Sequence, residues 1–166
     1  MNFSKRSTFD SSPNELAVAL ERRRARGEAV IDLTESNPTR AGVPHDEREI
    51  TAALADARSM RYEPEPFGLP SARETIARAH DVDASRVVLT ASTSEAYGFL
   101  FTLFCDPGDE VLAPAPSYPL FAQLAQIAGV KLVPYRLRYD GAWHVDLASL
   151  RAARTNRTRA ILVVNP

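Results

Sequence analysis

The sequence has few lysines, one cysteine and almost no net charge. Its 166 residues carry 20 basic and 21 acidic side chains, which gives a formal charge of −1. A chain without a global positive field has no general attraction to nucleic acid or to an anionic membrane surface, so neither is expected as a partner. Cys105 is alone, which excludes a disulfide framework within the chain and favours a reducing compartment. A cytoplasmic location is therefore predicted.

Several sequence features that would indicate a particular function are also missing. No apolar run approaches the roughly 20 residues of a membrane-spanning helix, and the first ten residues have no signal-peptide core. The glycine-rich loops that bind dinucleotides and nucleoside triphosphates are absent. The histidines, at positions 45, 80 and 144, lack the spacing of metal ligands, so no metal site is predicted.

What the sequence does have is an alternation of short apolar runs and amphipathic segments. Strands are expected at Ala29–Leu33, Val87–Thr90, Glu110–Ala113, Lys131–Arg136 and Ala160–Val164. Helices are expected from Pro13 to about Arg26, from about Asp46 to Arg58, from Ser71 to about His80, from about Ala96 to Phe104, from Phe121 to Ala128 and from about Asp146 to Arg154. Such alternation predicts the α/β class, as a three-layer α/β/α arrangement around a mostly parallel sheet, with an N-terminal helical arm.

Two helix starts show capping boxes. Ser12 to Glu15, with proline at the first helical position, and Ser71 with Glu74 both match that pattern. The arginines that end the first helix, just before Gly27, are interpreted as partners of the helix dipole. The first ten residues are expected to form a loose arm.

The most informative stretch runs from Val87 to Pro119. The predicted strand at its start leads into Ser92, Thr93 and Ser94, and then into a helix whose apolar residues on nearly every side predict a buried element. The first N–H groups of a helix lack intrahelical partners and lie at the positive end of its dipole, so this turn could bind a phosphate. The alternative is that Ser92 or Thr93 only caps the helix.

The end of the following strand supports a ligand site. Ligands in open α/β sheets collect beyond the carboxyl ends of strands, and Tyr118 lies just past such an end. Asp109 and Glu110, at the other end of that strand, are interpreted as solvated charges in a turn. The residues alone therefore predict a phosphate-ligand site and no complete catalytic set.

The order of these motifs resembles the N-terminal half of a class I/II aminotransferase, a fold-type I enzyme that depends on pyridoxal 5'-phosphate. The matching pieces are Ile31–Pro38, Tyr62 with Gly68–Arg73, Leu89–Ala96, Asp106–Val111, Pro116–Pro119 and Ile161–Pro166. Six motifs in the family's order and spacing make the resemblance specific. It implies transfer of an amino group from an amino acid to a 2-oxo acid.

The resemblance also implies roles for single residues. Ser92, Thr93 and Ser94 match the turn that holds the cofactor phosphate, and Tyr118 matches the aromatic residue that stacks on the pyridine ring. Tyr62 matches a tyrosine that reaches the phosphate of the neighbouring subunit, which implies a homodimer when the protein is full length. Ser36 and Asn37 match the segment beside the substrate carboxylate. Many members have glycine in place of Ser36, so the substrate preference stays open.

The resemblance covers no catalytic residue. The family's Schiff-base lysine lies further downstream, and neither Lys5 nor Lys131 has its context, so the chain alone is expected not to transaminate. Residues 1–45 are expected to form the arm and a small-domain segment, and residues 46–166 the first part of the large cofactor domain. Alternatives are a lyase of the same fold, or a non-catalytic phosphate-binding or dimerising fragment. An unpaired apolar sheet edge would make the isolated chain marginally stable and prone to aggregate.

Overall fold

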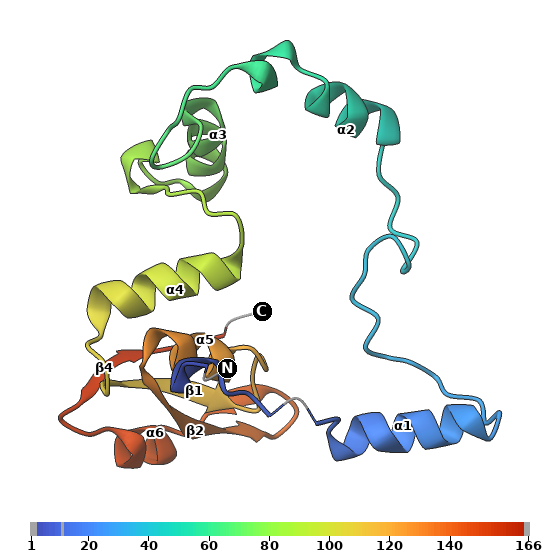
Figure 1. Cartoon of the computed structure of the whole chain (residues 1–166), viewed down its shortest axis with the longest axis vertical. Helices are drawn as coiled ribbons and strands as arrows, with labels where there is room; N and C mark the ends of the chain where they lie inside the picture. Colours follow the sequence, from blue (N-terminus) through green and yellow to red (C-terminus); the bar gives the residue numbers. More distant parts are fainter. Residues whose placement is uncertain (1–2, 11, 165–166) are drawn as a thin grey trace. The chain divides into compact units, whose positions relative to one another are not determined.

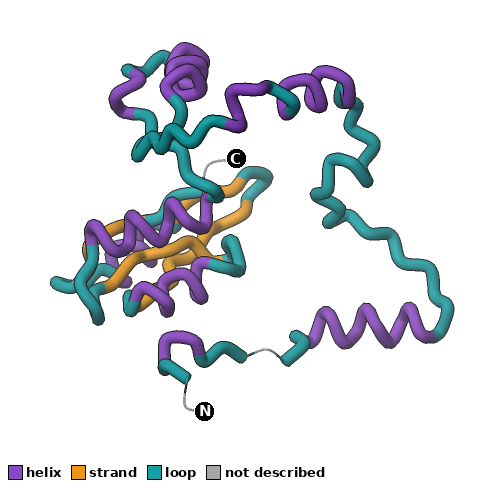
Figure 2. The backbone as a smooth tube through the Cα atoms, turned by 45° about the horizontal axis from the view of Figure 1, so that its top comes forward, coloured by secondary structure: helices purple, strands orange, loops and turns teal. Residues whose placement is uncertain are grey.

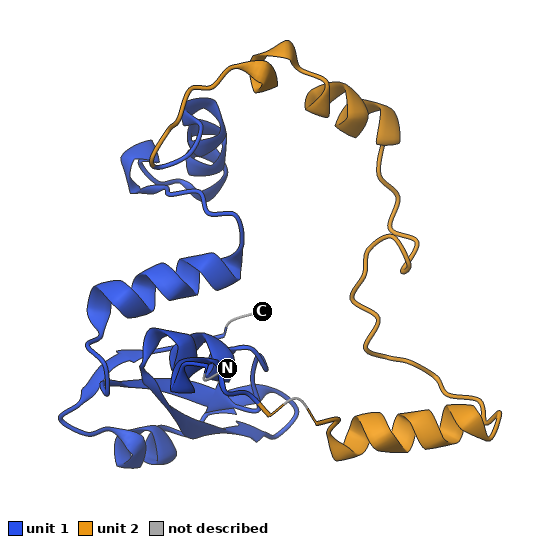
Figure 3. Ribbon diagram, viewed as in Figure 1, with its two compact units in different colours: residues 1–9, 67–166 blue, residues 10–66 orange. Residues whose placement is uncertain are grey.

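The computed structural model describes residues 3–10 and 12–164. The Asn165–Pro166 end of the last matching motif lies outside the described residues. The chain divides into two compact units, one formed by residues 1–9 and 67–166 and the other by residues 10–66 (Figure 3).

The first unit is built on a four-stranded sheet with the order β3-β2-β1-β4. Figure 1 labels β1, β2 and β4. Its strands are β1 (Glu110–Ala115), β2 (Lys131–Tyr139), β3 (Trp143–Val145) and β4 (Thr158–Ile161). The central strand β1 pairs in parallel with β2 and with β4, whereas the edge strand β3 pairs antiparallel with β2. The predicted α/β class with a mostly parallel sheet is confirmed.

Helices cover both faces of this sheet. Helices α4 (Thr93–Phe104) and α5 (Phe121–Ala128) lie on one face and α6 (Leu147–Ala153) on the other, which makes three layers (Figures 1 and 2). The core between the sheet and the first two helices contains Phe101, Val111, Ala125 and Val130, all nearly inaccessible to solvent. These residues are apolar and spaced to face one another, so their burial accounts for the position of α4 and α5 on the sheet.

Helix α4 is less buried than its composition predicts. Phe101 faces the core, but Phe99, Leu103 and Phe104 are more than half exposed. The sheet presents one surface to the helix, and the described residues supply no second layer for its other side. The prediction of a buried helix is therefore wrong for most of its surface in this chain.

Two predicted strands are not strands in the structure. Residues 29–33 and 87–90 have no ladder partner among the described residues. The second segment is held by other contacts. The Leu89 N–H donates to the Phe67 carbonyl at 3.0 Å, and the Arg73 guanidinium donates to the carbonyls of Val87 and Ala84 at 2.8 and 2.7 Å. Residues with a high β-propensity favour an extended backbone, but a strand also needs a neighbouring strand to pair with.

Arg73 belongs to α3 (Pro70–His80), which the loop at Gly68 precedes. This helix has proline in its first turn and no side-chain cap, so the predicted capping box of Ser71 and Glu74 is wrong. The proline has no N–H that needs a cap, which explains why none is present. The short 3-10 helix η3 (Ala84–Arg86) connects α3 to residues 87–90.

The N-terminal arm is attached to the first unit. Its residues 5–7 form the 3-10 helix η1 (Lys5–Ser7), and the Gln126 amide on α5 donates to the carbonyls of Lys5 and Thr8 at 3.2 and 2.9 Å. The prediction of a loose arm is therefore wrong for these residues.

The second unit contains two helices, α1 (Glu15–Ala25) and α2 (Glu47–Leu54), and the 3-10 helix η2 (Ala57–Met60). Asn14 caps α1 through its side-chain oxygen, which accepts from the Ala17 N–H at 2.8 Å. The predicted cap, Ser12, is two residues too early, and Pro13 precedes the cap and does not occupy the first helical position. Asp46 caps α2 in the same way, since its side-chain oxygen accepts from the N–H groups of Arg48 and Glu49. The prediction of one helix up to Arg58 is wrong at its end, because α2 stops at Leu54. No helix in the described part of the chain is long and apolar enough to cross a membrane.

The charges at the start of β1 are buried, contrary to the prediction of a solvated turn. Asp109 is 9% and Glu110 6% exposed. Asp109 accepts from the Arg159 guanidinium at 2.8 Å, and Glu110 accepts from Lys131 at 3.1 Å and from the Thr155 hydroxyl at 2.6 Å. The three partners come from β2 and from the β4 side of the sheet, so the two carboxylates join the amino ends of three strands.

These contacts predict a loss of stability in acid. The hydrogen bond from Arg159 lowers the pKa of Asp109, and the hydrogen bonds from Thr155 and Lys131 lower the pKa of Glu110. A carboxyl group whose pKa is depressed in the folded state stabilises that state above its unfolded pKa and loses this effect as the pH falls through the folded value. The denaturant midpoint should therefore fall from about pH 5 downward.

The variant Glu110→Gln tests the source of this slope. This variant keeps the side-chain shape but cannot ionise. Its denaturant midpoint should be lower than that of the parent protein at pH 7, and the midpoint should change less between pH 5 and pH 3. The matched control is Glu74→Gln, on the exposed side of α3. Equal acid slopes in the parent and in Glu110→Gln would contradict the assignment.

Candidate functional site

The turn that begins α4 is organised by two reciprocal hydrogen bonds. The Ser92 hydroxyl oxygen accepts from the Glu95 N–H at 3.2 Å, and the Glu95 carboxylate accepts from the Ala91 N–H at 2.7 Å. The Thr90 hydroxyl also donates to the Ser92 carbonyl at 2.9 Å. Ser92 is therefore the N-cap of the helix. The capping alternative is correct for Ser92, and it leaves the next two residues available.

Thr93 and Ser94 keep their donors uncommitted. Within the described part of the chain, neither their N–H groups nor their hydroxyls have a hydrogen-bond partner. Two backbone N–H groups and two hydroxyls thus lie together at the positive end of a 12-residue helix. This donor set suits the oxygens of a phosphate group, which accept several hydrogen bonds at once.

Sequence reasoning missed Glu95, although its signal is present. The pattern Ser92-x-x-Glu95 is a capping box, and the structure shows the reach back to the preceding backbone, here to Ala91 rather than to the cap itself. Arg73 was part of a matching motif, but its contacts to the two carbonyls before the turn follow only from the folded chain.

A series of aromatic contacts connects α4 to Tyr118. Tyr97, one turn into α4, meets Phe121 of α5 edge to face at 4.9 Å between ring centroids, and Phe121 meets Tyr118 in the same manner at 5.3 Å. Edge-to-face pairs of this kind are a favoured geometry. The turn with the open donors and Tyr118 therefore lie at the same end of the first unit, at the carboxyl edge of β1.

Tyr118 borders a shallow hollow of about 200 Å³. Its lining is mostly apolar and comes from the end of β1, the loop that follows and the start of α5, with Pro114, Pro116, Tyr118, Phe121 and Leu132 among its residues. Tyr118 is 45% exposed, so part of this residue is accessible to a ligand. A flat ring beside an apolar hollow suits a flat ligand with a polar substituent.

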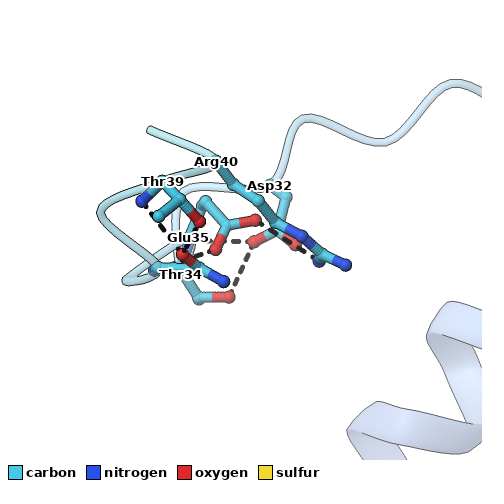
Figure 4. A network of polar contacts seen from close by, with 6 residues as sticks. Asp32, Thr34, Glu35, Thr39 and Arg40 are labelled. Carbon is cyan, nitrogen blue, oxygen red and sulfur yellow. Dashed lines mark hydrogen bonds and ion pairs between the residues drawn. The ribbon is translucent and has the colours of Figure 1, made fainter. Parts of the chain in front are cut away.

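The other predicted site residues lie in the second unit. Ser36 and Asn37 are exposed in a loop that side-chain hydrogen bonds hold together (Figure 4). Asp32 accepts from the N–H and the hydroxyl of Thr34, Asn37 accepts from the N–H and the hydroxyl of Thr39, and Glu35 accepts from the Asn37 N–H. Arg40 lies 3.7 Å from the Glu35 carboxylate.

The conformation of this loop is held by hydrogen bonds among its own residues. Short polar side chains bond to backbone two residues further on, which is a common way to hold an irregular segment without a strand partner. The Asn37 side-chain oxygen is occupied within the loop. Tyr62, the remaining predicted site residue, is 92% exposed in the segment that leads out of η2.

Comparison with known proteins places these features in a family. The family model described as aminotransferase class I and II matches residues 28–166. Mouse tyrosine aminotransferase is 30% identical over 82% of this chain and 32% of its own length, and alanine aminotransferase of Mycobacterium bovis is 30% identical over 86% of this chain and 35% of its own. The chain thus spans about a third of the length of these relatives.

Solved structures agree. Alanine aminotransferase from Pyrococcus furiosus superposes with a TM-score of 0.80 at 29% identity, covering 99% of this chain and 44% of that one. An aspartate aminotransferase from Thermus thermophilus gives a TM-score of 0.77 at 25% identity, covering 98% of this chain and 44% of that one. Because the family model matches most of the sequence, the chain belongs to the class I and II aminotransferase family.

Proposed function

We propose that this chain supplies the phosphate-binding and ring-stacking part of a pyridoxal-phosphate-dependent aminotransferase. The whole protein would transfer an amino group from an amino acid to a 2-oxo acid. The observation that carries the proposal is the aromatic series from Tyr97 through Phe121 to Tyr118, which puts the open donors of α4 and the exposed tyrosine ring at one edge of the sheet. Named relatives include tyrosine, alanine and aspartate aminotransferases.

The described residues fit this cofactor. The N–H groups and hydroxyls of Thr93 and Ser94 would hold its phosphate, with the Ser92 hydroxyl hydrogen as a further donor. Tyr118 would lie against its ring, and the apolar hollow would exclude water from that face. When bound, pyridoxal phosphate withdraws electrons from the amino-acid Cα and so makes its proton acidic.

Fixing the phosphate and the ring would orient the reacting carbon of the substrate. A ligand held at two points has little freedom to rotate or move. Residues that bind it away from the reacting atoms therefore contribute to the rate by fixing its orientation. Ser36 and Asn37 are proposed to meet the substrate, and Tyr62 the cofactor phosphate of a second subunit in a homodimer. Residues 46–166 are proposed as the first part of the large cofactor domain. A cytoplasmic location is proposed from the single cysteine.

The lysine that attaches the cofactor is proposed to lie elsewhere in the whole protein. Lys5 donates no side-chain contact in the described part of the chain, and Lys131 pairs with Glu110 at the amino end of the sheet, the edge opposite Tyr118. An ion-paired ammonium at the wrong edge is unsuited to act as the nucleophile.

The test uses the full-length product of the gene. It is incubated with pyridoxal phosphate, reduced with borohydride and digested, and the labelled lysine is identified by mass spectrometry. We expect one labelled lysine other than Lys5 and Lys131, together with formation of a new amino acid when an amino donor and a 2-oxo acid are both supplied. Consumption of the amino donor without any acceptor would instead indicate a lyase. Labelling confined to Lys5 or Lys131 without turnover would indicate the non-catalytic fragment.

A further inference from the structure

The pairing of β1 with β4 stops at a residue whose carbonyl lacks its usual donor. Leu112 pairs with Ile161, and the Leu162 N–H donates to the Leu112 carbonyl at 2.8 Å. In a parallel ladder the carbonyl of the same residue accepts from the N–H two positions further along the neighbouring strand. For Leu162 that position is Pro114, which has no N–H.

The hydroxyl of Tyr135 replaces the missing donor. It donates to the Leu162 carbonyl at 2.8 Å. Tyr135 lies on β2 and pairs in register with Pro114, so its side chain reaches across the central strand to the far neighbour. The residue is 1% exposed, and this burial raises the pKa of its phenol, which keeps the hydroxyl protonated as a donor.

The missing N–H of Pro114 also affects the path of the chain after β4. Because proline interrupts the ladder, β4 ends at Ile161, and Val163 and Val164, both more than half exposed, are not part of the sheet. The predicted strand, which ran to Val164, is wrong at its end for this reason. The departure occurs at the carboxyl edge, where the loop with Tyr118 also leaves β1. In open α/β sheets, ligand sites form at the carboxyl edge, where the segments that follow two neighbouring strands diverge.

We propose that Pro114 and Tyr135 act together to open the sheet at this edge, with Tyr135 as a positioning residue for the segment from Leu162 to Val164. The proline removes the ladder hydrogen bond that would continue β4 alongside β1. The tyrosine satisfies the carbonyl that the proline leaves without a donor, so the departing segment begins from one defined position. That this segment borders a cofactor site rests on the proposed function; the hydrogen-bond replacement does not.

The test is a double-mutant cycle in the full-length protein without cofactor, read by amide hydrogen exchange. Tyr135→Phe removes the hydroxyl and keeps the buried ring, so the Leu162 amide should exchange about fivefold faster, as expected for the loss of one hydrogen bond. The Lys131 amide, bonded to the Asp109 carbonyl at the other end of the sheet, is the internal reference and should not change.

The second variant supplies a donor from the main chain. Pro114→Ala restores an N–H that faces β4, because the Glu110 N–H four residues earlier donates to the Arg157 carbonyl on that side. In this background Tyr135→Phe should no longer accelerate exchange at Leu162. The matched control is Pro134→Ala on β2, whose new N–H faces away from β1, since the Lys131 N–H faces β1 and successive residues alternate. It should not rescue Tyr135→Phe.

Each outcome decides the proposal. Rescue by Pro114→Ala and not by Pro134→Ala supports it, since a packing role of the ring would be rescued by neither. The proposal is overturned if Tyr135→Phe leaves the exchange rate of the Leu162 amide unchanged. It is also overturned if Tyr135→Phe accelerates this exchange equally in the parent and in the Pro114→Ala background.

Cofactor binding is measured on the same four proteins. Pyridoxal phosphate should bind roughly threefold more weakly to Tyr135→Phe, with recovery in the double variant, if misplacing the segment costs part of one hydrogen bond. Equal affinity in all four would overturn the positioning role. Failure of the parent protein to bind pyridoxal phosphate would refute the proposed function, while the exchange data would still decide the hydrogen-bond replacement.

Discussion

Substitution of Gly68 by alanine is expected to destabilise the protein by about 2–5 kcal/mol, the sum of backbone strain and overpacking. Gly68 has a φ of +90°, where side chains with a Cβ are strained. An added Cβ would lie 2.6 Å from the Leu89 Cβ and 2.7 Å from its Cγ. Leu89 has little freedom to move because its N–H is bonded to the Phe67 carbonyl, on the residue next to Gly68.

The loss is large in relation to the whole. Folded proteins are stable by about 5–15 kcal/mol, so a loss of about 2–5 kcal/mol is a substantial share of the total. The segment that would move leads directly into Thr90 and the turn of α4, so the effect is expected to reach the candidate site as well. Urea denaturation of the parent and the variant measures it.

Gly141→Ala separates the two causes. Gly141 also has a positive φ, of +103°, but a Cβ there would meet no atom within 4 Å. It should therefore show the backbone strain alone, about 1–2 kcal/mol. A Gly68→Ala loss no larger than that of Gly141→Ala would show that Leu89 yields and that the close approach is not a constraint.

The second large effect is expected at the phosphate turn. Ser94→Asp should weaken binding of pyridoxal phosphate by roughly 100-fold, since a hydrogen bond to a charged group is lost and two like charges are brought close. Ser94 occupies the second position of α4, where a negative charge interacts favourably with the helix dipole. The variant should therefore keep its thermal stability while it loses affinity, which distinguishes a local effect from unfolding.

A matched variant tests the specificity of this effect. Ser71 occupies the same second position in α3, so Ser71→Asp introduces the same charge at another helix start and should leave cofactor affinity unchanged. Pyridoxal without its phosphate should bind equally to the parent and to Ser94→Asp. Unchanged affinity of Ser94→Asp for the phosphorylated cofactor, followed by its absorbance, would mean that the phosphate binds elsewhere.

The exposed apolar surface of α4 bears on how these experiments are made. Phe99, Leu103 and Phe104 face away from the core of the first unit. Apolar groups in such number on one helix favour association. The expected marginal stability of the chain alone stays a prediction. The full-length product is therefore the appropriate material for each comparison.

Local signals in the sequence identified most helices and the central strands. The helix periodicity of residues 121–128, the apolar run at the start of β1 and the turn at Gly108 act within a few residues, so they are legible without the fold. The motif order was also sufficient for the family, which the comparison of residues 28–166 confirms. Two predicted caps were wrong, because Asn14 caps α1 in place of Ser12 and α3 begins at Pro70 without a side-chain cap.

What only the tertiary structure decided are the partners that come from distant parts of the chain. The sequence could not show that Asp109 and Glu110 are buried, since their partners Arg159 and Thr155 lie about 45 to 50 residues away. It could not show that residues 87–90 lack a strand partner, or that β4 ends early because Pro114 faces it. Strand pairing and burial depend on which segments meet, and the hydroxyl of Tyr135 on the Leu162 carbonyl exists only once three strands are side by side.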